Sequence, residues 1–131
     1  MAGIAVLAHS PLATALVSCA EHVLGRSPDV TALDILPGEC SADCAERVAT
    51  ELFAVNQGDG LLLITDLPGA SPCNIAAGAA KILKQRGVPV IVLGGASASM
   101  LLKAINYRHL QLPELAQKAQ SGAAQSIVCI D

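Results

Sequence analysis

A histidine and an aspartate each follow directly on a short apolar run of this 131-residue chain. His9 follows the run Gly3–Ala8, and Asp66 follows the run Gly60–Thr65. Such runs, apolar without alternation, are typical of strands buried on both faces of a parallel sheet. A carboxylate that accepts a hydrogen bond from one imidazole nitrogen fixes the ring's tautomer, which makes the other nitrogen a directed nucleophile or base. A reactive imidazole is therefore predicted where these two strands end side by side.

The segment after Asp66 has the features of an anion site. Ser71 followed by Pro72 is predicted to be an N-cap followed by proline at the first helical position. Backbone N–H groups and the helix dipole favour an anion at such a terminus. The residues predicted to bind phosphate are Ser71, Gly69, Ala70 and Asn74. A histidine, a carboxylate and an anion site together indicate phosphoryl transfer through a phosphohistidine; the chain has no Walker-type loop, so a nucleotide is not the expected donor.

Each of these residues also has a purely structural interpretation. A lone histidine such as His9 is more often just a polar residue at a strand end. Asp66 precedes Leu-Pro-Gly and could simply begin a turn. Ser71 could do no more than cap its helix. The functional interpretation depends on His9 and Asp66 lying at the ends of the first and third strands.

The spacing of apolar residues predicts alternating strands and helices. Strands are expected at Gly3–Ala8, Val30–Leu36, Gly60–Thr65, Val88–Leu93 and Ser126–Ile130. The segments between them show helical spacing, and Pro113 is expected to start a short fifth helix. This order predicts an α/β protein, a flavodoxin-like three-layer sandwich with a mostly parallel sheet of order 2-1-3-4. Ligands of such sheets bind where the strand order reverses, which here is between strands one and three.

Composition limits the remaining possibilities. The net charge is −3 and no basic stripe is present, so nucleic acid is not an expected partner. No apolar run is long enough to span a bilayer and no signal peptide is evident, which predicts a cytoplasmic protein that is not membrane-embedded. The length predicts a single domain over residues 1–131. The five cysteines include no Cys-x-x-Cys pair, and no metal site is expected; Cys40 and Cys44 could share a helix face.

The chain resembles the enzyme IIA domains of the mannose family of the bacterial phosphoenolpyruvate-dependent sugar phosphotransferase system. The resemblance covers essentially the whole chain and rests on His9 after its strand, the Pro37-Gly38-Glu39 turn and the loop Asp66–Asn74. That loop usually reads Asp-x-x-Gly-Gly-Ser-Pro-x-Asn in the family, and here Ala70 replaces the second glycine. Met100-Leu101-Leu102 is a weaker match, preceded by Ser97 and Ser99 where the family often has Asn and Pro.

The resemblance implies a role for each of these residues. His9 would be the phosphorylated residue, Asp66 the carboxylate that orients it, and Ser71 a neighbour of the phosphoryl group. The family accepts phosphate from the phosphocarrier HPr, passes it to a IIB partner, and needs no metal or other cofactor. It is typically a homodimer, in which Ser126–Ile130 would form an antiparallel strand exchanged between subunits.

Three alternatives remain open at the level of sequence. One is the related phosphocarrier subunit that serves dihydroxyacetone kinase, which differs only in the acceptor. Another is a regulatory module in which phosphorylation of His9 signals nutrient status. The third is a flavodoxin-like domain that binds a small anion without covalent chemistry. The resemblance specifies neither a sugar nor an acceptor.

Overall fold

The computed structural model describes residues 1–39 and 41–131. Strands and helices alternate along the chain until two helices follow one another at the end. The elements are β1 Gly3–His9, α1 Leu12–Leu24, β2 Thr31–Ile35, α2 Ser41–Val55, β3 Leu61–Thr65, α3 Ser71–Gln85, β4 Val90–Leu93, α4 Ala98–Asn106 and α5 Leu112–Gln125. Among the described residues, no helix is both long and apolar enough to cross a membrane.

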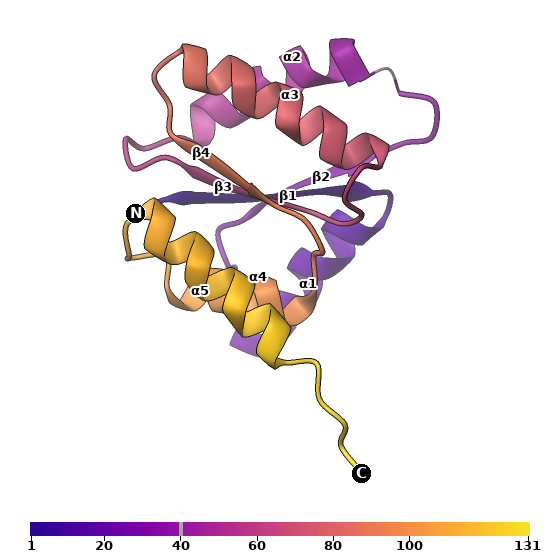
Figure 1. Cartoon of the computed structure of the whole chain (residues 1–131), viewed down its shortest axis with the longest axis vertical. Helices are drawn as coiled ribbons and strands as arrows, with labels where there is room; N and C mark the ends of the chain where they lie inside the picture. The colour runs from indigo at the N-terminus through magenta and orange to yellow at the C-terminus, as the bar shows by residue number, and fades with distance from the viewer. Residues whose placement is uncertain (40) are drawn as a thin grey trace.

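The four strands form one parallel sheet in the order β2-β1-β3-β4. This is the predicted order, and it makes β1 and β3 direct neighbours. Helices α2 and α3 cover one face of the sheet, and α1, α4 and α5 cover the other (Figure 1). The three-layer, flavodoxin-like architecture expected from the alternation of elements is thus confirmed.

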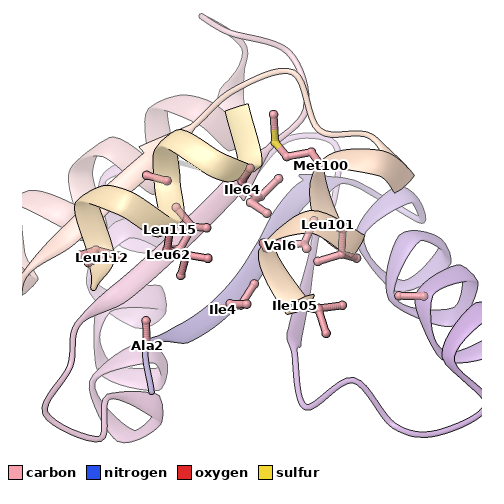
Figure 2. Packing of buried hydrophobic residues seen from close by; sticks show 14 of the residues in the cluster. Ala2, Ile4, Val6, Leu62, Ile64, Met100, Leu101, Ile105, Leu112 and Leu115 are labelled. Atoms are coloured by element: carbon pink, nitrogen blue, oxygen red, sulfur yellow. The ribbon is translucent and has the colours of Figure 1, made fainter. Parts of the chain in front are cut away.

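The sheet separates two apolar clusters. Alternate residues of a strand point to opposite faces, so β1 contributes Ile4 and Val6 to one cluster and Ala5 and Leu7 to the other. Figure 2 shows the first cluster, in which the strands meet the buried faces of α4 and α5. The large side chains labelled there are Ile4, Val6, Leu62, Ile64, Met100, Leu101, Ile105, Leu112 and Leu115. Because β1 and β3 are buried on both faces, their sequences do not alternate.

Asp34 of the edge strand β2 stabilises the start of α1. Its carboxylate accepts the Thr14 backbone N–H at 3.2 Å and also the Thr14 hydroxyl. The N-cap residue of α1, Pro11, makes no side-chain capping bond, so this carboxylate satisfies a first-turn N–H from outside the helix. The helix ends at Gly25, whose φ of 72° is the left-handed conformation that favours glycine. The first helix begins at Leu12, three residues after His9 in the chain.

The C-terminal part of the chain differs from expectation. Helix α5 has 14 residues, so the prediction of a short helix was wrong. Its buried face includes Gly122, where the helix packs closely on Lys103 of α4. The expected strand at Ser126–Ile130 is not formed in the single chain, whose last residues point away from the body (Figure 1). A strand needs a partner strand to satisfy its backbone groups, and these residues have none within their own chain.

Helix α3 begins one residue earlier than the sequence predicted. Ala70, with φ −80° and ψ 172°, occupies the N-cap position of α3, and Ser71 is the first helical residue. The expectation that Ser71 is the N-cap was therefore wrong. Helix α2 begins at Ser41 and has the acidic residue Asp43 in its first turn, where a negative charge suits the helix dipole. Whether Cys40 and Cys44 share a helix face depends on Cys40, which lies outside the described residues.

Candidate functional site

His9 and Asp66 are in direct contact at the C-terminal edge of the sheet. The ring nitrogen Nδ1 of His9 lies 2.6 Å from Oδ2 of Asp66. The same carboxylate oxygen accepts the backbone N–H of His9 at 2.9 Å, and Oδ1 accepts the Leu67 N–H at 2.8 Å. The carboxylate therefore fixes both the backbone and the ring of His9.

The sheet register explains why residues so distant in sequence meet. In the parallel pairing of β1 with β3, Leu7 lies opposite Thr65. His9 follows Leu7 by two residues and Asp66 follows Thr65 by one, so both stand where the two strands end. On its other side His9 pairs with Ile35 of β2, which places it at the centre of this edge.

Hydrogen bonding keeps the carboxylate ionised. Burial by itself would raise the pKa of Asp66, but the hydrogen bonds from the His9 backbone, the His9 ring and the Leu67 backbone outweigh it and leave the pKa below its ordinary value. An ionised carboxylate only accepts hydrogen bonds, so Nδ1 of His9 carries the hydrogen. The lone pair of the neutral imidazole is consequently on Nε2.

The two side chains differ in their exposure to solvent. The side chain of Asp66 is only 7% exposed, whereas that of His9 is 50% exposed. The arrangement can therefore orient a nucleophilic nitrogen toward solvent while its partner stays buried. The contact itself is the one predicted from the positions of the two residues in the sequence.

The predicted anion-binding residues lie in and beside the loop between β3 and α3. Gly69 has a φ of 86°, and its carbonyl accepts a hydrogen bond from the Asn74 side-chain amide at 3.4 Å. Ala70 closes the turn by donating its N–H to the Leu67 carbonyl at 3.1 Å. Ser71 at the first turn of α3 is exposed. Asn74 thus braces the loop, and Ser71 is the member of this group that shares a cavity with His9.

A cavity of about 270 Å³ lies next to the imidazole. Its lining comes from the ends of β1 and β2, the loop after β2 and the start of α3: His9, Ser10, Ile35, Leu36, Pro37, Gly38, Glu39 and Ser71. A larger cavity of about 710 Å³ lies at the opposite end of the sheet, lined by Met1, Val90 and Leu112 among others, and contains neither His9 nor Asp66. The smaller cavity, which His9 lines, is therefore the candidate site.

Sequence reasoning did not assign Glu39 or Leu36 to the site. Both lie in the loop between β2 and α2 and line the cavity of His9. Glu39 Oε1 accepts the backbone N–H of Leu36, three residues earlier, at 2.7 Å. In a capping box, a glutamate accepts the backbone N–H of the residue three positions earlier, and Glu39 has the same spacing from Leu36. This spacing could have suggested the bond between Glu39 and Leu36.

Comparison with known proteins agrees with this fold. The family model of the phosphotransferase system (PTS) fructose IIA component matches residues 3–120. The transcriptional regulatory protein LevR of Bacillus subtilis (strain 168) is 28% identical over 119 residues, which are 88% of this chain. The chain spans only 12% of the length of that relative.

Solved structures of similar fold include two components of the phosphotransferase system. The phosphotransferase component EIIA of Streptococcus agalactiae has a TM-score of 0.85 at 24% identity, covering 98% of this chain and 97% of that one. The mannose/sorbose-specific IIA subunit of Enterococcus faecalis has a TM-score of 0.86 at 19% identity, covering 99% and 95%. A sigma-54 interaction domain protein of Enterococcus faecalis has a TM-score of 0.78 at 20% identity, covering 96% and 93%. Because the family model spans nearly the whole sequence, this chain belongs to the EIIA-man family of phosphotransferase-system IIA components.

Proposed function

We propose that this protein is a cytoplasmic phosphoryl carrier of the sugar phosphotransferase system, formed as one domain by residues 1–131. The observation that carries the proposal is the 2.6 Å contact between Nδ1 of His9 and the buried carboxylate of Asp66. It leaves Nε2 of a half-exposed imidazole as the nucleophile. Family membership favours phospho-HPr as the donor and a IIB component as the acceptor.

The transfer uses few groups. The Nε2 lone pair of His9 attacks the phosphorus of the donor's phosphohistidine, forming a new N–P bond. The N–P bond of the donor breaks, and its electron pair returns to the donor imidazole. The hydrogen on Nδ1 stays in place, and the Asp66 carboxylate balances the positive charge that develops on the ring. The acceptor then attacks the same phosphorus, and Nε2 recovers its lone pair.

The start of α3 supplies the electrostatic part of the site. The first-turn N–H groups of a helix lack intrahelical acceptors and favour an anion. Ser71 brings a hydroxyl and this helix terminus to the cavity that His9 lines. We assign Ser71 and Asn74 of α3, with Gly69 and Ala70 of the preceding loop, to phosphoryl binding. Positioning and charge stabilisation are the main requirements of phosphoryl transfer.

A labelling experiment with a chase tests this function. The protein is incubated with labelled phosphoenolpyruvate, enzyme I and HPr, and we expect about one phosphoryl group per chain, held in an acid-labile and alkali-stable linkage, because a single nucleophilic imidazole is oriented. The labelled protein is then mixed with a IIB component or with the dihydroxyacetone kinase subunits. Loss of label to either identifies the acceptor. Absence of any label on the wild-type protein would contradict the proposal.

A regulatory role is the second candidate. The match to LevR, a transcriptional regulatory protein of which this chain covers 12%, is the observation that favours it. The fold is also shared with the sigma-54 interaction domain protein of Enterococcus faecalis. In that case, label on His9 would persist through the chase with both acceptors, and the phosphorylated chain would act by changing its affinity for another protein. The donor step is common to both candidates.

The last residues support a homodimer. Ile127 and Ile130 are 85% and 91% exposed, and β4 is an edge strand of the sheet. A chain that has both an open sheet edge and an exposed apolar tail favours exchange of the tail between two subunits. We expect the protein to elute as a dimer in size-exclusion chromatography with light scattering, and a version truncated after Gln125 to elute as a monomer. A truncated protein that remains dimeric would exclude this mode of assembly.

A further inference from the structure

The turn between β2 and α2 is closed by one glutamate. Pro37 and Gly38, whose φ is 83°, have the residue types and the positive φ of the central positions of a type II turn. The Glu39 N–H donates to the Leu36 carbonyl at 3.4 Å, and Oε1 of Glu39 accepts the Leu36 N–H at 2.7 Å. The side chain and the backbone of Glu39 thus close the same turn.

The second oxygen of Glu39 reaches helix α2. Oε2 accepts a hydrogen bond from Arg47 Nη2 at 2.7 Å and one from Cys44 Sγ at 3.0 Å. The hydrogen bonds from Cys44, from the Leu36 backbone and from Arg47 lower the pKa of Glu39 to about 2, so the group is ionised at neutral pH. One carboxylate therefore ties the turn to the helix, and Arg47 compensates its charge.

This turn is a wall of the cavity beside His9. Residues 35–39 line the cavity together with His9 and Ser71. The Ser10 N–H donates to the Ile35 carbonyl at 3.0 Å, which fixes the base of the turn to the residue after His9. Leu36 lines this cavity and is 58% exposed, so its side chain is accessible to a protein that approaches His9. A wall that is held in place before binding lowers the entropy cost of docking.

We propose that Glu39 is a positioning residue: through its bonds to Leu36, Arg47 and Cys44 it holds the turn against which the phosphoryl-donor protein docks. This inference rests on the proposed carrier function. It predicts an effect on the KM for a protein donor rather than on the chemistry at His9, because Glu39 acts through the position of the turn. The reaction of His9 with a small donor that needs no docking surface is expected to be insensitive to Glu39.

Two variants test the proposal by initial rates of labelling at increasing concentrations of phospho-HPr. Glu39→Ala removes every side-chain bond, and we expect the KM to rise about tenfold at nearly constant kcat. Glu39→Gln keeps an oxygen for the Leu36 N–H but loses the charge that binds Arg47, so a smaller rise is expected. Both should reach the wild-type end point of labelling. Glu46→Gln, on the exposed part of the same helix, is the matched control and should behave as wild type.

Phosphoramidate is a small phosphoryl donor that needs no docking surface. It therefore distinguishes a variant with weakened donor docking from one in which His9 itself reacts more slowly. Equal rates for the wild type and Glu39→Gln with phosphoramidate, together with unequal KM values for phospho-HPr, support the inference. Unchanged KM values in both Glu39 variants would overturn it, as would a parallel loss with both donors. Glu39→Gln decides the matter even where Glu39→Ala fails to fold. Failure of the carrier function itself is a different result, namely wild-type protein that takes no label from phospho-HPr.

Discussion

Replacing His9 with alanine is expected to abolish labelling from phospho-HPr completely. Within the part of the chain that the structure describes, the imidazole is the only nucleophile that the Asp66 carboxylate orients, and no rate remains when the attacking nitrogen is gone. The ring is half exposed, so its loss leaves little empty space in the core. Asp66 retains the N–H groups of residue 9 and of Leu67, and the free energy of unfolding should fall by only about 1 kcal/mol.

The other two histidines of the chain provide the control for this experiment. His22 in α1 and His109 before α5 are both exposed, and replacing either with alanine should leave labelling unchanged. Labelling is measured at equal concentrations of folded protein, established by circular dichroism and by the urea midpoint. A phosphoryl group found on His9→Ala, or lost from His22→Ala or His109→Ala, would place the reacting nitrogen elsewhere.

Replacing Asp66 with asparagine should slow phosphorylation by about 100-fold or more without removing the nucleophile. Asparagine cannot balance positive charge on the ring. Its amide can also donate a hydrogen bond to Nδ1, which favours the tautomer with hydrogen on Nε2 and hides the attacking lone pair. Rapid-quench labelling gives the rate, and nitrogen NMR of labelled histidine reports the tautomer of His9.

Asp59→Asn is the matched control for this carboxylate. Asp59 is exposed, pairs with the N-terminal amine at 2.7 Å, and belongs to the loop at the opposite end of β3. Its replacement removes the same charge from the protein and should leave the labelling rate unchanged. A normal rate in Asp66→Asn would show that the buried carboxylate serves only the fold.

The central pair was predictable because it depends on topology rather than on side-chain detail. Non-alternating apolar runs identified β1 and β3, and the alternation of strands and helices gave a parallel sheet whose order reverses between them. Two residues at the ends of adjacent parallel strands must then be neighbours. The contact of His9 with Asp66 is a consequence of that register.

Two other side-chain contacts between elements were not revealed by the sequence. The bond of Glu39 to Arg47 joins a turn to an exposed helix face, and the bond of Asp34 to Thr14 joins an edge strand to a helix start. Neither has a periodic signal, since each depends on how two elements pack. Helix α5 was underestimated for a related reason: Gly122 lowers helix propensity, but its lack of a side chain is what lets α5 approach Lys103.

In the proposed carrier function, the half exposure of His9 also determines how long a phosphoryl group stays on the chain. A group on Nε2 remains within reach of water as well as of a docking protein. Its lifetime is therefore set by a competition between hydrolysis and collision with an acceptor. A buried imidazole would protect the group but exclude both partners, whereas this one favours rapid turnover over storage.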